Sequence, residues 1–398
     1  MPGPLDGIRI VDLTQVVSGP LSTMMLADQG ADVIKIEHPK GGDFTRAVSN
    51  RRGGHTANFL NNNRNKRSIA IDLKDPRGLA IVQKLIETAD AVVQNFRPGV
   101  VERMGLGEAD VREINPCVVY VSISGFGDAG PYAGKPVYDP LIQALSGLTT
   151  VQAGSDGERP RLVRTILPDK LTGVTAAQAI TAALFARERT GKGQHVRLSM
   201  LDSVIAFLWH SDMGSQTFVG EDRPQQEAQS FIDLVYETAD GYMTVSVMTD
   251  RQWLALTRVL ERPEWLEDPR FASAEKRQIN INDRLTLTQE ALLERPTAEW
   301  LERLEAEDVP CAPILKRGDM ITHPQITAND IVVEYDHAEA GRLRQARPPA
   351  RFSGTPTVPP KGAPILGEHT GDVLREAGYS ETEITDLSSA GVIGGAGA

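Results

Sequence analysis

The chain has 398 residues, of which 40% are hydrophobic and 24% are charged, and its formal net charge is −11. This length exceeds what one hydrophobic core usually supports, so two domains are expected. The acidic balance argues against a nucleic-acid-binding protein, which would carry a basic domain or stripe. No apolar run approaches the roughly 20 residues that span a bilayer, so no membrane partner is expected either.

The cysteines and histidines indicate the cellular compartment of the protein and whether it has a metal site. Cys117 and Cys311 stand alone in apolar surroundings, and the seven histidines are scattered without a ligand-like pair. This pattern predicts reduced thiols, no disulfide framework and no metal site. The opening stretch "MPGPLDGIRIVDL" has no basic region followed by an apolar one, so no export signal is predicted. We therefore expect a cytoplasmic protein.

The first half of the chain alternates apolar strands with helices. Helices are predicted at 20–30, 75–89 and after residue 164, and strands are predicted at 7–13, 31–37, 67–73, 90–96, 117–124 and 193–200. Strand–helix–strand units of this kind favour a parallel sheet with right-handed crossovers. The sequence therefore predicts an α/β fold, with a Rossmann-like, doubly wound large domain over residues 1–204.

The second half is less regular. Residues 226–322 contain a predicted hairpin around Asp240 and Gly241, followed by helical stretches, and are assigned to a smaller α+β domain. The polar, turn-rich segment 205–225 and residues 323–334 are predicted linkers. The proline-rich region beyond shows no clear periodicity, and the glycine-rich tail "AGVIGGAGA" is expected to be frayed.

A glycine motif, "GFGDAG" at 125–130, matches the dinucleotide pattern G-x-G-x-x-G. A dinucleotide site requires this run to open a helix and an acidic residue about 20 positions later. Here the motif continues into Pro131, Tyr132 and Gly134, and the acidic residue is missing. We therefore reject an NAD-dependent oxidoreductase and expect no tightly bound cofactor.

Two basic clusters follow predicted strands. "NNNRNKRSIAIDLKDPRG" at 61–78 holds five cations in eighteen residues, and "QNFRPGVVERMG" adds Arg97 and Arg103. On charge alone, a solvated basic face is the commoner interpretation. Because open α/β sheets bind ligands at the carboxyl ends of their strands, a long, phosphorylated ligand is the functional alternative.

Asp169 stands at the start of a helix with many small side chains, including Thr172, Gly173, Ala176, Ala177 and Ala183. An aspartate in this place is usually an N-cap. The small side chains would let another backbone or a ligand come close, and the helix dipole would keep the carboxylate ionised. An ionised carboxylate can also act as a nucleophile toward an activated acyl group. The residues alone leave both roles open.

Taken together, the motifs resemble the class III (family III) coenzyme A transferases, the group that includes formyl-CoA transferase and the carnitine and bile-acid CoA transferases. The matching pieces, in chain order, are "PLDGIRIVDLTQVVSGP", "GADVIKIE", "NRNKRSIAIDLKDPRG", "VVQNFRPGVVERMG", "ISGFGDAGPY", "YDPLIQALSGL", "DKLTGVTAAQAITAALFARERTGKGQHVRLSMLD" and "ILGEHTGDVLREAGYS".

The resemblance implies that Asp169 is the catalytic nucleophile. It would pass through a mixed anhydride and an aspartyl-CoA thioester as CoA moves from an acyl-CoA donor to a carboxylic acid. The resemblance also implies that residues 335–398 return to complete the large domain, and that two chains interlock as a homodimer. The CoA contacts that it implies are Val17, Ser18, His38, Ile71, Asp72, Leu73, Lys74, Asn95, Phe96, Arg97, Arg103, Lys135 and Tyr138.

Two alternatives remain open. An α-methylacyl-CoA racemase of the same fold would need a histidine before the aspartate of "YDPLIQ", where this chain has Tyr138, and an acid near Met248. A non-catalytic acyl-CoA-binding protein would not need Asp169.

Departures from formyl-CoA transferase, which has glutamine and tryptophan where this chain has Val17 and Val48, argue against formyl and oxalate substrates. A second substrate carboxylate, as in succinyl-CoA, would find candidate partners in Arg46, Arg51, Arg52 and Arg164.

Overall fold

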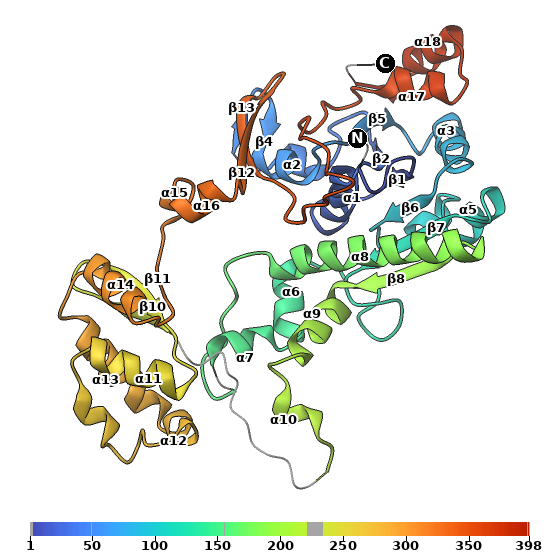
Figure 1. The fold of residues 1–398 in the computed structure, drawn as a ribbon. Helices are drawn as coiled ribbons and strands as arrows, with labels where there is room; N and C mark the ends of the chain where they lie inside the picture. The colour runs from blue at the N-terminus through green and yellow to red at the C-terminus, as the bar shows by residue number, and fades with distance from the viewer. Residues whose placement is uncertain (1–2, 49, 155, 221–233, 396, 398) are drawn as a thin grey trace. The chain divides into compact units, whose positions relative to one another are not determined.

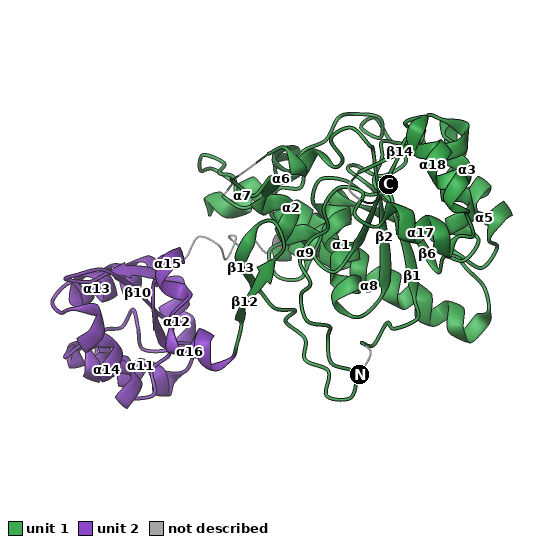
Figure 2. Cartoon of the chain, turned by 90° about the horizontal axis from the view of Figure 1, so that it is seen from above, with its two compact units in different colours: residues 1–229, 330–398 green, residues 230–329 purple. Residues whose placement is uncertain are grey.

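The structure, a computed structural model, describes residues 3–48, 50–154, 156–220, 234–395 and 397. The chain divides into two compact units, one formed by residues 1–229 and 330–398 and the other by residues 230–329 (Figure 2). The predicted linker 205–225 begins inside helix α9 (Met200–Trp209). Its part after residue 220, and the predicted start of the small domain at 226, lie outside the described residues.

The first unit is built on a seven-stranded sheet with the order β14-β5-β2-β1-β6-β7-β8 (Figure 1). The strands are β1 (Arg9–Asp12), β2 (Asp32–Glu37), β5 (Arg67–Ile71), β6 (Ala91–Gln94), β7 (Val119–Ser124), β8 (His195–Ser199) and β14 (Ile393–Gly394). All pairs are parallel except β14 with β5. The predicted α/β class with a parallel sheet is confirmed, and each predicted strand is present with slightly shorter bounds.

Helices cover both faces of this sheet. One face carries α1 (Ser18–Asp28) and α8 (Leu167–Thr190), and the other carries α3 (Pro76–Ile86), α5 (Glu108–Ile114), α17 (Thr370–Glu376) and α18 (Glu381–Ser389). Successive side chains of a strand point to opposite faces, so Ile10 packs in the α1/α8 core and Val11 packs in the other. Burial on both faces explains why the central strands carry apolar residues on both sides.

The strand order reverses between β1 and β6. The chain first builds outward from β1 to β2 and β5, and then returns to place β6 on the other side of β1. The loops that follow these two strands therefore diverge, and they leave a crevice at the carboxyl edge of the sheet. The loop after β7 does not open a helix directly, because the next described helix, α6, begins at Asp139. This agrees with the rejection of a dinucleotide site at "GFGDAG".

Shorter elements complete the first unit. They are η1 (Phe44–Arg46), β3 (Arg51–Arg52), β4 (His55–Thr56), α2 (Ala57–Asn62), α4 (Val100–Arg103), α6 (Asp139–Leu145), α7 (Leu148–Ala153), α10 (Gly214–Thr217), β12 (Val332–His337) and β13 (Gly341–Ala346). Strands β12 and β13 pair antiparallel along their whole length, in the region where the sequence shows no clear periodicity.

The prediction of a frayed C-terminal tail is wrong for Ile393 and Gly394. These residues form β14, which adds to the edge of the sheet with Ile393 opposite Ile71. Val392 and Ile393 are buried in the core beneath α17 and α18. A glycine-rich composition lowers strand propensity, but the edge of β5 and the burial of two β-branched side chains override it.

The second unit has its own core. A three-stranded antiparallel sheet, β9 (Val235–Glu237), β10 (Tyr242–Val245) and β11 (Cys311–Pro313), has the order β11-β10-β9 and includes the predicted hairpin. Trp253, Trp265, Phe271 and Trp300 dominate the core. The helices are α11 (Asp250–Val259), η3 (Pro263–Leu266), α12 (Ala274–Ile279), α13 (Ile281–Leu292), α14 (Thr297–Ala306), α15 (Arg317–Met320) and α16 (Pro324–Ala328).

We expect Ile393→Ala to lower the free energy of unfolding by about 2–5 kcal/mol, because it leaves a cavity at a fully packed position. Ile279→Ala is the matched control, because Ile279 is 72% exposed and should change stability by about 0.5 kcal/mol or less. Urea unfolding of both variants makes the comparison. Equal stability of the two variants would show that β14 does not contribute to the core.

Candidate functional site

The larger cavity at the carboxyl edge of the sheet has a volume of about 650 Å³. It lies over the ends of β1, β2 and β5 and is lined by Leu13, Gln15, Ile36, Glu37, His38, Ile71, Asp72, Leu73, Lys74, Pro76, Leu79, Phe96, Val100, Arg103 and Met104. Its walls are mainly apolar, with cationic groups among them. Such a surface suits a ligand that combines a flat ring with phosphate groups.

A smaller cavity of about 240 Å³ shares Phe96 with the first. Its lining is Val16, Ser18, Asn95, Phe96, Arg97, Pro98, Ile123, Ser124, Gly125, Ala133, Lys135, Val137, Tyr138, Asp169 and Met200. Asp169 and every residue predicted to contact CoA line one of the two cavities, apart from Val17. Val17 is buried as the N-cap residue of α1.

Asp169 is not the N-cap of its helix. Helix α8 begins at Leu167, its N-cap position is Ile166, and no side chain caps it. The Asp169 carboxylate instead accepts a hydrogen bond from the backbone N–H of Ser18, at the start of α1. The capping interpretation is therefore wrong, because the carboxylate is directed at another helix and into the smaller cavity.

Burial raises the pKa of Asp169 from 3.8 to about 6, and the neighbouring Asp139 carboxylate adds to this rise. The hydrogen bond from Ser18 opposes both effects. The helix dipole is expected to keep the carboxylate ionised, and in the structure burial and Asp139 act in the opposite direction. With a pKa of about 6, Asp169 is still about nine tenths ionised at pH 7.

Asp139 is the residue that the sequence reasoning missed. It opens α6, is only 4% exposed, and accepts hydrogen bonds from the Gln143 side chain (2.6 Å) and the backbone N–H of Asp169 (3.4 Å). Burial raises the pKa of Asp139 as well. The signal available in the sequence was an aspartate followed by proline at a helix start, but its proximity to Asp169, thirty positions away, is a property of the tertiary structure.

Small residues bring α1 and α8 together. A Cβ atom added to Gly173 would lie 2.9 Å from the backbone oxygen of Ser18 and 2.9 Å from the Leu21 side chain. At Gly173, the small-sided face of α8 therefore receives the backbone of α1. This close approach places the first N–H of α1 at the Asp169 carboxylate, one helical turn before Gly173.

Cationic side chains surround the two cavities. Lys74 and Arg103 are exposed at the larger one, where His38 Nε2 lies 4.0 Å from Asp72 Oδ1. Arg97 and Lys135 are exposed at the smaller one. These positive groups lie within reach of anionic ligands, despite the net charge of the chain.

Asn95 is engaged with the protein itself. Its side-chain oxygen accepts from the Gln15 backbone N–H (2.9 Å), and its side-chain nitrogen donates to the Gln15 carbonyl oxygen (2.8 Å). Both ends of the amide therefore hold the β1–α1 loop. Asn95 lines the smaller cavity, but its hydrogen bonds support the cavity wall.

The arginines predicted to hold a second carboxylate differ in availability. Arg46 donates two hydrogen bonds of 2.7 Å to Glu37, while Arg51 and Arg52 donate to backbone carbonyl oxygens. Arg164 is exposed in the segment that leads into α8. Arg46, Arg51 and Arg52 are thus engaged with the protein, whereas the guanidinium of Arg164 is exposed.

The described part of the chain contains no cluster of three or more histidine, cysteine, aspartate or glutamate side chains arranged to hold a metal ion. Within the same residues, no helix combines the length and the apolarity needed to cross a bilayer.

The similarity of the chain to known proteins identifies its family. The model of CoA-transferase family III matches residues 5–370. Human succinyl-CoA:glutarate CoA-transferase is 34% identical, with 98% of this chain and 90% of the relative covered. The chain belongs to CoA-transferase family III. It is thus a CoA-transferase enzyme, and the transfer of CoA between acyl-CoA and acid substrates is its general activity.

Further relatives differ in substrate. Acetyl-CoA:oxalate CoA-transferase of Acetobacter aceti is 35% identical, with 96% of this chain and 97% of the relative covered. Formyl-CoA:oxalate CoA-transferase of Escherichia coli is 34% identical, with 97% and 99% covered. Among solved structures, a CAIB/BAIF family protein from Brucella suis is 31% identical with a TM-score of 0.81, and 95% of this chain and 100% of that one are covered.

We expect Asp169→Asn to raise the free energy of unfolding of this protein by about 1–3 kcal/mol at pH 7. The folded-state pKa of Asp169 lies above its unfolded value, so the native protein binds more protons between pH 3.8 and about 6. The wild type therefore loses stability as the pH rises through this range, and the variant does not. Urea unfolding at pH 4, 5, 6 and 7 measures the difference, and a gain that does not grow with pH would contradict the assignment.

Proposed function

We propose that this enzyme transfers CoA from an acyl-CoA donor to a carboxylic acid through covalent intermediates on Asp169. The observation that carries the proposal is an ionisable carboxylate in the smaller cavity, partly desolvated and held by the Ser18 N–H. Desolvation makes a carboxylate a better nucleophile, while a pKa of about 6 leaves it ionised at neutral pH.

In the first half-reaction, an Asp169 oxygen attacks the thioester carbonyl of the donor. The carbon–sulfur bond breaks, CoA leaves as the thiolate, and a mixed anhydride links Asp169 to the acyl group. The thiolate then attacks the aspartyl carbonyl, the donor acid leaves as its carboxylate, and an aspartyl-CoA thioester remains. Each step replaces one activated acyl bond by another, so no ATP is needed.

In the second half-reaction, the acceptor carboxylate attacks the aspartyl thioester and again releases CoA thiolate. The thiolate attacks the acceptor carbonyl of the new anhydride, which forms the product acyl-CoA and returns Asp169 as a carboxylate. Exclusion of water matters at both anhydride stages, since hydrolysis would waste the activated group. When the thiolate or the acceptor carboxylate attacks the aspartyl carbonyl, negative charge develops on the Asp169 oxygen. The Ser18 N–H would stabilise this charge.

The two cavities share Phe96, so we propose that one CoA molecule lies across both. We assign the adenine ring and the phosphate groups to the larger cavity, where Lys74, Arg103 and His38 supply positive charge. The pantetheine arm would pass Phe96, which both cavities share, and bring the sulfur to Asp169. Arg97, Lys135 and Tyr138 line this second part, and the proposed contacts at Ile71–Lys74 line the first.

For the substrates, we propose succinyl-CoA as donor and a dicarboxylic acid as acceptor. The names of the relatives pair succinyl-CoA with glutarate, and acetyl-CoA or formyl-CoA with oxalate, so each includes a dicarboxylic acid. The exposed guanidinium of Arg164, close in sequence to α8, is the partner that we propose for the distal carboxylate.

Racemisation is the less favoured function. It requires a group that removes the α-proton and another that returns it. None of the described residues that line the smaller cavity is a histidine, and Tyr138 occupies the place where one would be expected. A purely binding role is less favoured as well, because burying a carboxylate beside Asp139 is costly and would serve no purpose in a passive site.

We also propose that the enzyme acts as a homodimer. Helices α6 and α9 of the first unit carry large apolar side chains that are about half exposed, namely Leu141, Leu145, Phe207 and Trp209. Apolar groups of this size in solvent are more common at interfaces than on the free surface of a monomer. Sedimentation of the full chain tests the proposal.

Asp169→Ala is expected to abolish CoA transfer while leaving CoA binding and folding intact, because it removes the nucleophile but not the cavity walls. Transfer is measured with succinyl-CoA and glutarate, and CoA binding by calorimetry. Turnover in this variant at the wild-type rate would refute the covalent mechanism.

Hydroxylamine offers a direct test of the intermediate. Incubating the wild-type enzyme with succinyl-CoA and hydroxylamine should convert Asp169 to a hydroxamate and inactivate the enzyme, because hydroxylamine attacks an activated aspartyl carbonyl. Peptide mass spectrometry locates the adduct. The Asp169→Ala variant serves as the control. A wild-type protein that stays unmodified, yet exchanges the α-proton of a 2-methylacyl-CoA into heavy water, would favour racemisation.

The pH dependence of kcat/KM should report the ionisation of Asp169. Below about pH 6 the rate should fall roughly tenfold per pH unit, because only the ionised carboxylate attacks. Asp139→Asn removes the repulsion between the two carboxylates, so the acidic limb should move to lower pH. A limb that stays in place would mean that Asp139 does not act on Asp169.

A panel of donors and acceptors distinguishes the proposed substrate class. Succinyl-CoA should react faster with glutarate than with butyrate, which is glutarate with hydrogen in place of the distal carboxylate. Arg164→Ala should reduce this preference by about 10-fold, the effect of losing one charge-assisted hydrogen bond. Equal preference in the variant and the wild type would assign the distal carboxylate to another residue.

A further inference from the structure

We propose that Asp43 is a positioning residue for catalysis, because it holds Val16 in a left-handed conformation that aligns the α1 N-terminus with Asp169. This inference rests on the proposed nucleophilic role of Asp169. Asp43 lies in the turn between β2 and η1, is 1% exposed, and lines neither cavity. It therefore acts through the β1–α1 loop and not on the substrate.

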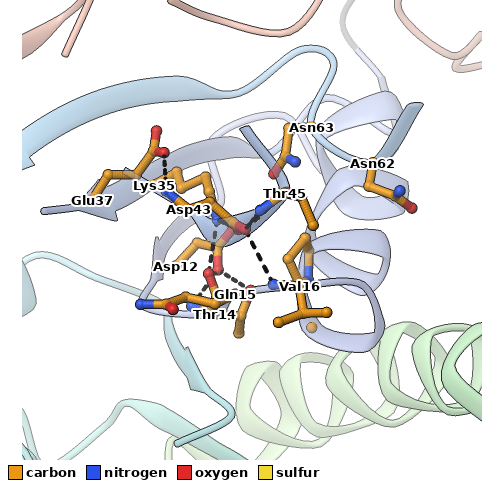
Figure 3. A network of polar contacts seen from close by, with 12 residues as sticks. Asp12, Thr14, Gln15, Val16, Lys35, Glu37, Asp43, Thr45, Asn62 and Asn63 are labelled. Carbon is orange, nitrogen blue, oxygen red and sulfur yellow. Dashed lines mark hydrogen bonds and ion pairs between the residues drawn. The ribbon is translucent and has the colours of Figure 1, made fainter. Parts of the chain in front are cut away.

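The β1–α1 loop is held through its backbone by buried polar side chains (Figure 3). Asp12 accepts from the Thr14 N–H at 2.9 Å, and the Lys35 ammonium donates to the Thr14 carbonyl oxygen at 2.7 Å. Asp43 Oδ1 accepts from the Val16 N–H at 3.3 Å. Asn95 holds both backbone groups of the intervening residue, as described above.

Val16 is the strained point of this loop. Its φ angle is +72°, which a β-branched side chain rarely adopts because its Cβ crowds the backbone. Such strain persists only where surrounding contacts over-determine the conformation, and it is found preferentially at functional sites. Val16 lines the smaller cavity together with Asp169, and Ser18 follows two residues later.

A change of the Val16 φ angle to a negative value would alter the surroundings of Asp169. Rotation to negative φ would redirect the chain just before Ser18, whose N–H holds the Asp169 carboxylate. The Gly173 contact fixes where α8 meets the Ser18 carbonyl, but it does not fix the direction in which the N–H points. The hydrogen bond that the Val16 N–H donates to Asp43 Oδ1, together with the bond from Asn95 to the Gln15 carbonyl oxygen, holds the peptide before Val16 and opposes this rotation.

The surroundings of Asp43 show how its carboxylate is kept in place. Oδ1 also accepts from the Thr45 backbone N–H (2.9 Å) and hydroxyl (2.8 Å), and Oδ2 lies 3.0 Å from the Lys35 ammonium. The contact with Lys35 is an ion pair whose geometry is not that of an aligned hydrogen bond. Lys35 and Asp43 thus contact adjacent parts of the β1–α1 loop, the Thr14 carbonyl oxygen and the Val16 N–H.

The test uses the full chain and succinyl-CoA, with single-turnover formation of the aspartyl-CoA thioester followed by quenching and mass spectrometry. Asp43→Ala should lower the rate constant by about 10- to 100-fold, as expected for a displaced reacting group. Thr45→Val is the matched control. It removes a donor to the same oxygen without touching Val16, and should change the rate constant less than about threefold. A purely structural role would lower the amplitude, which counts folded sites, and leave the rate constant unchanged.

The decisive variant adds Val16→Gly to Asp43→Ala. Glycine adopts positive φ without a steric cost, so the loop no longer needs Asp43 to oppose rotation. The double variant should recover the rate constant by about fivefold or more over Asp43→Ala. If Asp43→Ala does not fold, Asp43→Asn with and without Val16→Gly makes the same comparison, because the neutral amide is a weaker acceptor.

The outcomes separate the two proposals. A wild-type enzyme that forms no adduct on Asp169 overturns the proposed function. A wild type that forms the adduct, with an Asp43 variant that forms it equally fast, overturns the positioning role alone. Absence of any recovery by Val16→Gly overturns it as well. A slower Asp43 variant that Val16→Gly accelerates supports it.

Discussion

The candidate site depends on the close approach of two helices, α1 and α8. Gly173 allows the backbone of α1 to lie against α8, since any side chain there would meet the Ser18 carbonyl oxygen at 2.9 Å. The same contact brings the first N–H of α1 to Asp169, one turn earlier on α8. The small side chains of α8 serve this contact. Without it, the carboxylate would lose the Ser18 N–H, which favours its ionised form.

Asp169 is held between opposing electrostatic effects. Burial and Asp139 favour its protonated form, and the Ser18 N–H favours its ionised form. A carboxylate in water is well solvated and therefore a weak nucleophile, whereas one that is fully neutralised cannot attack at all. A pKa of about 6 lies between these limits. The balance depends on backbone placement, so we propose that the loop before α1, with Val16 in its strained conformation, contributes to function even though its side chains carry no reactive group.

The order of strands in the sheet explains where the cavities lie. Because β1 and β6 are neighbours whose connections run in opposite directions, their following loops separate and leave room at the carboxyl edge. Residues from β2 and β5 extend this space to one side, and residues from β7 and α8 extend it to the other. Segments distant in the chain, such as Ile71–Lys74 and Lys135–Tyr138, thereby belong to two cavities that meet at Phe96. A long ligand can lie across both.

The amino-acid sequence by itself determined the parallel α/β sheet, the helix that carries Asp169 and the residues that surround the cavities, because these follow from local apolar patterns and from motifs of the family. Only the tertiary structure decided the charge and surroundings of Asp169. The pairing with Asp139, the approach of Ser18 and the engagement of Asn95 with the β1–α1 loop all join residues far apart in the chain. The edge strand β14 belongs to the same group, since its glycine-rich sequence predicts no strand and its pairing needs the exposed edge of β5. Local patterns encode local conformation, whereas desolvation and hydrogen-bond partners arise only when distant segments pack together.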